Sequence, residues 1–279
     1  MAETRYHPWR GPSEAIRVID MLKEVKGTQY LTALREGGSL PGIIEADNDG
    51  TYVVKFRGAG QGSAALVAEI VVGELGRHLG IRVPDLVILD VDAELARREP
   101  DQEVQQLLQA STGPNLAMDF LPGSVGYDGI AWRAPAEEAA RIYWLDALTA
   151  NVDRTWSNPN LLIWHRQLWA IDHGAALIFQ HSWPAVDGWA NRDYGMGSHV
   201  LSERVSSLAP PLLDALDAEL AALVSAEVLE RILDLVPDVF LASMNAADGA
   251  APQTLRRRYV EYLLARLASE RAWWPEALA

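Results

Sequence analysis

The stretch LDALTANVDRTWSNPNLLI at residues 145–163, followed by LWAIDHG at 168–174, decides how this chain is interpreted. A helical pattern runs into a polar loop that holds Asp153, and Asn158 follows five residues later. A predicted short hairpin comes next and leads to an Ile-Asp-x-Gly turn, in which Asp172 stands fourteen residues after Asn158. The ordered set is specific, although none of its residues would be informative alone.

Phosphoryl transfer requires groups of these types. One carboxylate orients the attacking hydroxyl, while an amide oxygen and a second carboxylate hold Mg²⁺ against the phosphates. The alternative is that Asp153, Asn158 and Asn160 only form turns, because Asp and Asn are common in loops.

A lysine in the first half of the chain supports the same chemistry. Only three of the 24 basic residues are lysines, and Lys55 lies in the apolar strand pattern TYVVKF. Glu69 follows fourteen residues later in a predicted helix. A strand lysine paired with a helix glutamate is how kinase-like folds place an ammonium on nucleotide phosphates. The alternative is a surface lysine on the solvated face of a strand.

A glycine-rich segment precedes that strand. Residues 37–42 read GGSLPG and connect two predicted strands, so their backbone N–H groups are available to a phosphate. The segment matches neither G-x-G-x-x-G nor a Walker A sequence. The alternative is an ordinary hairpin turn.

The composition of the chain argues against some classes of binding partner. The chain has 38 acidic and 24 basic residues and a net charge of −14, which repels nucleic acids and anionic lipid surfaces. We therefore expect no direct nucleic-acid partner and no membrane role, and no apolar run approaches the ~18 residues of a membrane span. The absence of cysteine excludes thiolate catalysis. Together with a polar N-terminus that lacks a signal-peptide core, it leads us to expect a cytoplasmic location.

Periodicity predicts an α+β chain in two lobes. The expected strands are 30–35, 41–46, 51–56 and 84–91, and the expected helices are 14–25, 64–80, 92–112, 136–150, 209–224, 226–236 and 252–272. We place an N-terminal extension and helix at 1–26, a β-rich N-lobe at 27–121, and a mainly helical C-lobe at 122–279.

Taken together, these pieces resemble the HipA-like kinases and, more distantly, the phosphatidylinositol kinases, whose loops share the Asp-Arg, Asn and Ile-Asp-x-Gly order. The resemblance covers roughly residues 27–240. It implies a bilobal protein-kinase-like fold with ATP and Mg²⁺ between the lobes. It also implies that Asp153 is the catalytic base, that Lys55 binds the nucleotide phosphates, and that Glu69 orients Lys55.

The same resemblance implies the remaining site residues. With the glycine-rich segment included, the nucleotide-binding residues would be Gly37, Gly38, Ser39, Lys55, Met118, Asp119, Phe120 and Leu121, of which the last four form a hinge against adenine. The metal ligands would be Asn158 and Asp172. Asn160 is a rival to Asn158, because Asn-Leu-Leu-Ile also resembles the asparagine and apolar strand of protein kinases.

The resemblance favours transfer of the γ-phosphoryl of ATP to a protein serine or threonine. A lipid or small-molecule alcohol as acceptor, a nucleotide-binding regulatory pseudokinase, and an interaction protein without nucleotide are the alternatives. His173 departs from the phenylalanine of an Asp-Phe-Gly motif. HipA toxins carry an additional N-terminal subdomain that we do not expect in 279 residues. An antitoxin-like partner is therefore possible but unsupported.

Two sets of ring side chains have both a structural and a functional interpretation. The histidines are expected to be loop and packing residues rather than a metal site: His165, His173, His181 and His199. Five of the ten tryptophans lie near the predicted active-site loops, where they either shape a substrate pocket or pack between the lobes: Trp156, Trp164, Trp169, Trp183 and Trp189.

Overall fold

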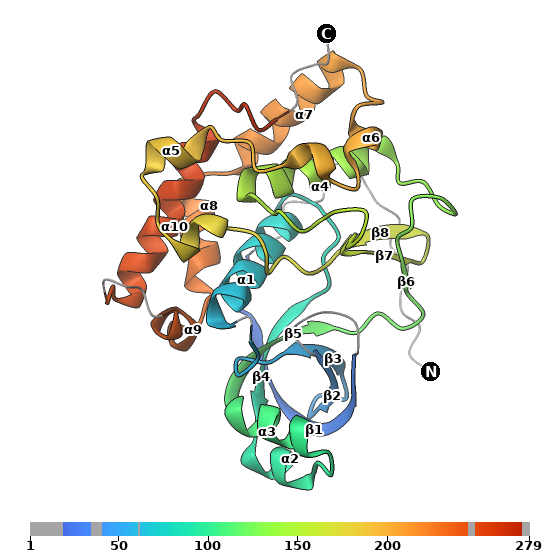
Figure 1. The fold of residues 1–279 in the computed structure, drawn as a ribbon, viewed down its shortest axis with the longest axis vertical. Coiled ribbons are helices and arrows are strands. Elements are labelled where there is room, and N and C mark those ends of the chain that lie inside the picture. Colours follow the sequence, from blue (N-terminus) through green and yellow to red (C-terminus); the bar gives the residue numbers. More distant parts are fainter. Residues whose placement is uncertain (1–18, 35–40, 61, 245–248, 275–279) are drawn as a thin grey trace.

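The computed structural model describes residues 19–34, 41–60, 62–244 and 249–274. Within them a small β-barrel is joined to a larger, mainly helical part (Figure 1). The strands are β1 (Lys23–Ala33), β2 (Gly42–Ala46), β3 (Thr51–Lys55), β4 (Leu86–Val91), β5 (Gly113–Asp119), β6 (Val125–Gly126), β7 (Leu161–Trp164) and β8 (Gln167–Ala170). The predicted α+β class, with a β-rich N-terminal lobe and a mainly helical C-terminal lobe, is confirmed.

Helices make up most of the second half of the chain. The helices are α1 (Gly62–His78), α2 (Ala93–Arg98), α3 (Gln102–Ala110), α4 (Ala136–Thr149), α5 (Val186–Ala190), α6 (Ser202–Val205), α7 (Pro210–Leu223), α8 (Ala226–Asp234), α9 (Asp238–Ser243) and α10 (Pro252–Leu267), with short 3₁₀ turns η2 (Ile178–His181) and η3 (Met196–Ser198). No helix in the described part of the chain is long and apolar enough to cross a bilayer.

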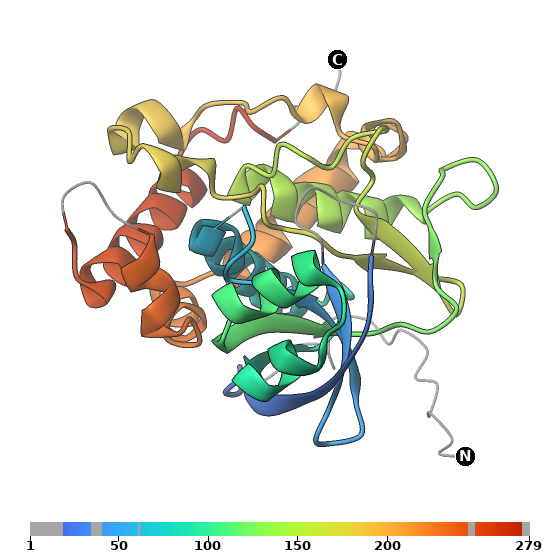
Figure 2. The ribbon, with the colours of Figure 1, turned by 60° about the horizontal axis from the view of Figure 1, so that its bottom comes forward.

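Five strands close into a barrel in the order β1-β2-β3-β5-β4. Closure depends on β1, which pairs antiparallel with β2 and parallel with β4, so that Val25 lies opposite Leu89. Apolar side chains such as Ile44 and Val54 fill the interior, because alternate residues of each strand point inward. Helices α2 and α3 lie against one end of the barrel (Figure 2) and add Leu95 and Leu108 to this core.

The helix predicted over 14–25 is wrong where the structure describes it. Residues 19–22 form no helix, and β1 begins at Lys23; residues 14–18 lie outside the described residues. The apolar spacing of a short window fits more than one element, and the free edge of β4 supplies a backbone partner that no local pattern reveals. The single helical segment expected over 92–112 is two helices, because Asp101 caps a new start at α3.

Helix α1 joins the barrel to the helical part and is buried on nearly all sides. A Cβ on Gly76 would lie 3.0 Å from Leu145 Cδ2, so the absence of a side chain lets α1 approach α4 closely. Helix α4 then ends at Thr149, and the next residue, Ala150, has a left-handed φ of 50° that turns the chain into the loop that contains Asp153. Helix α1 thus carries Glu69, and the loop that follows α4 carries Asp153.

The hairpin of β7 and β8 positions the last group of residues. Its antiparallel register pairs Leu161 with Ala170, so the residues that flank the two strands also meet. The N–H of Ile171 donates to the carbonyl of Asn160 at 3.1 Å. Asn160 and Asp172 are thereby brought next to each other, although twelve positions separate them.

Candidate active site

A cavity of 700 Å³ lies where β3 and β5 face the loops that follow α4 and β8. The predicted residues that line it are Lys55, Met118, Asp119, Phe120, Leu121, Asp153, Asn158, Asn160 and Asp172. Glu69 lies behind Lys55 rather than on the lining, and the predicted phosphate contacts Gly37, Gly38 and Ser39 lie outside the described residues. The fold thus gathers groups that are up to 117 positions apart.

Lys55 connects three elements at the wall of this cavity. Its ammonium donates to Glu69 Oε1 on α1 and to Asp172 Oδ1, the latter at 2.6 Å. Burial lowers the pKa of Lys55, but the two carboxylates raise it above its ordinary value, so the ammonium stays charged. Burial would raise the pKa of Asp172, yet Lys55 lowers it to about 2. The cavity therefore contains a fixed cation beside an ionised carboxylate.

Asp153 and Asn158 are in direct contact. The Asn158 side-chain amide donates to Asp153 Oδ2 at 2.8 Å, and the Asp153 N–H donates to Asn151 Oδ1 at 3.2 Å. The five-residue spacing therefore corresponds to a closed loop with both side chains at the cavity. One Asp153 oxygen faces Asn158, and the other has no hydrogen bond that this loop supplies.

Oxygen ligands for a cation are present on the same side. Asp172 offers a carboxylate, and Asn158 and Asn160 offer amide oxygens, which are the hard donors that Mg²⁺ prefers. The buried amide nitrogen of Asn160 has no hydrogen-bond partner among the described residues, so no bond of this nitrogen has to break for the amide to turn its oxygen toward a cation. The donor set fits a divalent cation. Among the described residues no cluster of three or more His, Cys, Asp or Glu side chains is placed to hold a metal ion, so this set relies on one carboxylate and two amides.

The segment 118–121 borders the cavity at the end of β5. The N–H of Asp119 donates to the Asp85 carbonyl at 2.8 Å, and the N–H of Phe120 donates to the Thr51 carbonyl at 3.0 Å. These bonds hold the segment against the barrel. They also mean that two of its backbone donors are already used within the protein.

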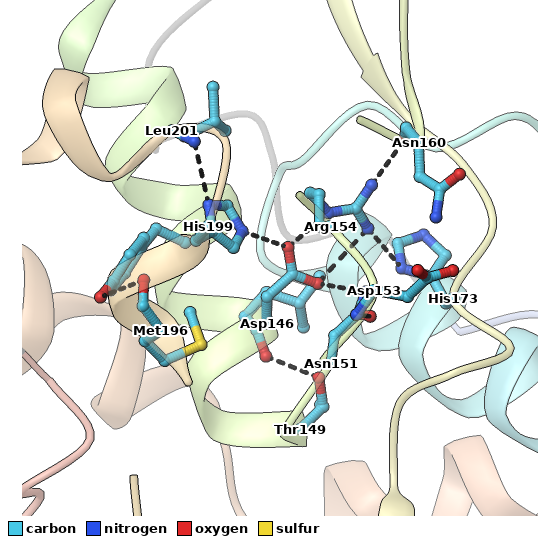
Figure 3. Close-up of polar contacts among 12 residues, drawn as sticks. Asp146, Thr149, Asn151, Asp153, Arg154, Asn160, His173, Met196, His199 and Leu201 are labelled. Carbon is cyan, nitrogen blue, oxygen red and sulfur yellow. Dashed lines mark hydrogen bonds and ion pairs between the residues drawn. The ribbon is translucent and has the colours of Figure 1, made fainter. Parts of the chain in front are cut away.

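Arg154 is the centre of a buried network next to the cavity (Figure 3). Its guanidinium, 1% exposed, donates to Asp146 Oδ2 at 2.5 Å and to Asp146 Oδ1 at 3.3 Å. It also donates to the carbonyls of Asn160 and Ile171 and to His173 Nδ1. One side chain therefore joins α4 to the residue before β7 and to the residue after β8.

The same network fixes two residues in unusual backbone conformations. Asn160 has a φ of 49° and Asp172 a φ of 54°, in the left-handed region that side chains other than glycine rarely adopt. Arg154 binds the carbonyl of Asn160 itself and the carbonyl of Ile171, which precedes Asp172. These contacts offset the strain and hold both side chains on the cavity lining.

His199 completes the network from the far side of α4. Its Nδ1 accepts the N–H of Leu201 at 3.1 Å, so its Nε2 carries the hydrogen and donates to Asp146 Oδ2 at 3.0 Å. Burial lowers the pKa of His199, although Asp146 opposes this shift. A second proton would also remove the bond from Leu201. His199 is therefore a neutral ring, despite its carboxylate partner.

His173 is neutral for a related reason. It is fully buried, and Arg154 donates to its Nδ1, so burial and the neighbouring guanidinium lower its pKa to about 3. The ring occupies the position that follows Asp172 and links that turn to Arg154. A phenylalanine there would have no acceptor for the guanidinium.

Sequence reasoning missed Asp146 and the roles of Arg154 and His199. One signal was available, since Asp146 is the only charged residue between Arg141 and Asp153 in a helix of apolar residues. A charge in such a position is rarely left unpaired. The contact with His199 spans 53 residues and has no local signal.

The barrel, the helical part and the cavity between them define a protein kinase-like bilobal fold. A family model described as HipA-like kinase matches residues 28–276. The chain belongs to the HipA-like kinase family, which confirms the resemblance found in its motifs and identifies it as a kinase.

Solved kinases show distant likeness to the chain. The Golgi casein kinase with Mn/ADP bound is 13% identical with a TM-score of 0.47, and the match covers 90% of this chain and 74% of that one. The Helicobacter pylori proinflammatory kinase CtkA is 12% identical with a TM-score of 0.48, covering 85% and 94%. No curated protein matches the sequence. The fold class rests on the chain's own architecture and on the family.

We predict that the Asp146–Arg154 pair is strongly coupled. Asp146→Asn keeps the shape but leaves the buried guanidinium without its counter-charge, so we expect a loss of ~3–5 kcal/mol in the free energy of unfolding. Arg154→Met should be destabilising as well, and the double variant should lose at least ~1 kcal/mol less than the sum. Urea unfolding of the four proteins measures this. Additive losses would contradict the pairing.

We also predict a pH dependence from His199. Its folded pKa is lowered, so below its unfolded value of ~6.5 the unfolded chain takes up a proton that the folded chain does not. The free energy of unfolding should therefore fall as the pH decreases from 7 to 5. In His199→Gln the fall should be shallower by up to ~1.4 kcal/mol per pH unit, measured by urea unfolding. The same change at the exposed His165 is the control, and equal slopes in all three proteins would refute the prediction.

Proposed function

We propose that this kinase transfers the γ-phosphoryl group of ATP to the hydroxyl of a protein serine or threonine, with Mg²⁺ as the cofactor. The observation that carries the proposal is the single cavity that Lys55, Asp153, Asn158, Asn160 and Asp172 share. The nucleotide would lie between a phosphate-binding lobe at 27–121 and a catalytic lobe at 122–279.

Lys55 is proposed to contact the nucleotide phosphates. Its ammonium is already held at the cavity wall by Glu69, so binding a phosphate requires no reordering of a long side chain. Glu69, which is 1% exposed, acts through Lys55 and is a positioning residue. The segment 118–121 would contact adenine, and the glycine-rich segment 37–42 would cover the phosphates.

Asp172 and either Asn158 or Asn160 are proposed to hold Mg²⁺, which supplies positive charge to the phosphate oxygens when bound. The low pKa of Asp172 keeps its carboxylate available at neutral pH. Lys55 contacts Asp172 in the present structure, so the ammonium and the cation would share this carboxylate or exchange places on it.

Asp153 is proposed to orient the acceptor. Its carboxylate accepts a hydrogen bond from the acceptor hydroxyl, whose oxygen attacks the γ-phosphorus. The bond from that phosphorus to the β–γ bridging oxygen breaks, ADP leaves, and the hydroxyl proton passes to Asp153. Asn158 holds one Asp153 oxygen at 2.8 Å, which leaves the other to face the acceptor.

We predict that Asp153→Asn abolishes phosphoryl transfer while leaving nucleotide binding intact. The amide keeps the size of the side chain but cannot accept the proton, so we expect a fall in turnover of at least ~10²-fold. Mass spectrometry of wild type and variant after incubation with Mg·ATP and candidate acceptors measures this and reports the type of acceptor. Unchanged turnover would refute the role of Asp153, and tight Mg·ATP binding without turnover in the wild type would favour a regulatory pseudokinase.

We predict that Lys55→Arg also loses transfer while the fold is retained. Arginine keeps the charge, but its planar guanidinium is larger than an ammonium that contacts two carboxylates in a buried site. Activity assays with thermal unfolding in the presence and absence of Mg·ATP separate loss of function from loss of fold. Wild-type activity in this variant would contradict the proposed contact.

A further inference from the structure

Four of the seven large apolar side chains that are exposed in the described part of the chain lie in two segments beside Asp153. They are Val125, Ile130, Val152 and Trp156. We call these four side chains the apolar rim. Isolated apolar residues on a surface are normal, but a concentration beside a catalytic group is characteristic of an interaction site.

The two segments of the apolar rim touch each other. A Cβ on Gly129 would lie 2.9 Å from the Trp156 ring, so the indole rests directly on the glycine backbone. Gly129 also has a φ of 67°, which disfavours a side chain there. The contact places the turn at 128–131 against the catalytic loop.

Ile130 is presented by an ordered turn. Asp128 Oδ1 accepts the N–H groups of Ile130 and Ala131, both at 2.9 Å, and this turn leaves Ile130 86% exposed. It is the most exposed of the seven side chains. Burying it on a partner would remove apolar surface from water, which is favourable.

The four rim side chains do not line the active-site cavity, but neighbouring residues of the two segments that carry them do. Tyr127 lines the cavity from the first segment, and Asp153 and Asn158 line it from the second. A ligand whose hydroxyl reaches Asp153 and which extends out of the cavity along these segments would contact the rim. A small molecule enclosed by the cavity would not.

We propose that the apolar rim docks the acceptor polypeptide, by binding a large apolar side chain close to the serine or threonine that is phosphorylated. This inference rests on the proposed transfer to protein hydroxyls. An aromatic residue such as Trp156 is the typical anchor of a protein interface. The hydrogen bonds from Ile130 and Ala131 lower the pKa of Asp128, so the turn carries a negative charge.

Charge favours a polypeptide over a membrane as the occupant. The net charge of −14 and the ionised Asp128 beside the rim would repel anionic lipid head groups. The same field favours a neutral or basic segment next to the apolar side chain of the acceptor. We therefore expect the rim to prefer apolar acceptors without acidic residues, a preference that rests on the net charge and on Asp128, since the exposed Arg133 follows the turn.

Peptide libraries with a central serine or threonine test this with wild type, Trp156→Ala and Ile130→Ser. Wild type should prefer a large apolar residue within a few positions of the hydroxyl and disfavour acidic flanks. Trp156→Ala should raise KM for the preferred peptide about tenfold, which equals ~1.4 kcal/mol, without a matching change in the Kd for Mg·ATP. Ile130→Ser should weaken the preference in a protein that folds normally, and Trp156→Phe should recover most of it.

Leu212→Ala is the matched control, because Leu212 is 58% exposed but lies on α7. It should behave as wild type. If neither Trp156→Ala nor Ile130→Ser changes peptide phosphorylation, the docking role of the rim is refuted, whereas the proposed protein acceptor is not. Transfer only to a lipid or a small alcohol would overturn both the rim and the proposed protein acceptor. Binding to phosphatidylcholine–phosphatidylserine vesicles that depends on Trp156 would assign the rim to a membrane instead.

Discussion

A buried arginine that must be neutralised determines the geometry of this active site. Arg154 is closed off from water, and a guanidinium there is tolerated only where carboxylate and carbonyl oxygens surround it. Asp146 supplies the charge from α4, while Asn160 and Ile171 supply carbonyls from the two ends of a hairpin. The contacts that neutralise and hydrogen-bond Arg154 therefore bring together the segments that carry the proposed base and the proposed metal ligands.

A second cluster of charged side chains, which includes Lys55 of the barrel, contacts the active-site turn from the N-terminal lobe. Lys55 contacts Asp172, and Arg154 contacts His173, so adjacent residues of one turn are attached to the barrel and to the helical part respectively. His173 serves this purpose because a neutral ring nitrogen accepts a hydrogen bond that phenylalanine could not. The turn that contains Asp172 and His173 is therefore in side-chain contact with both lobes.

Local sequence patterns predicted the order of the elements that surround the cavity. The helix of α4, the Asp153 loop, the hairpin and the turn at Asp172 follow the expected order. Prediction failed at residues 19–25, where the strand β1 depends on its pairing with β4 some sixty residues away. It also missed the contact between His199 and Asp146, because these residues are 53 positions apart. Both failures concern contacts between segments, for which a short window of sequence has no signal.

The sequence by itself determined which chemical groups are present and at what local spacing. Asp153 and Asn158 meet because they stand five positions apart in one loop, and that spacing is visible in the chain. Only the tertiary structure decided that Lys55 faces Asp172, and that the apolar rim forms where Trp156 rests on Gly129. The physical reason is that each contact joins segments that are distant in the sequence and meet only when the chain packs.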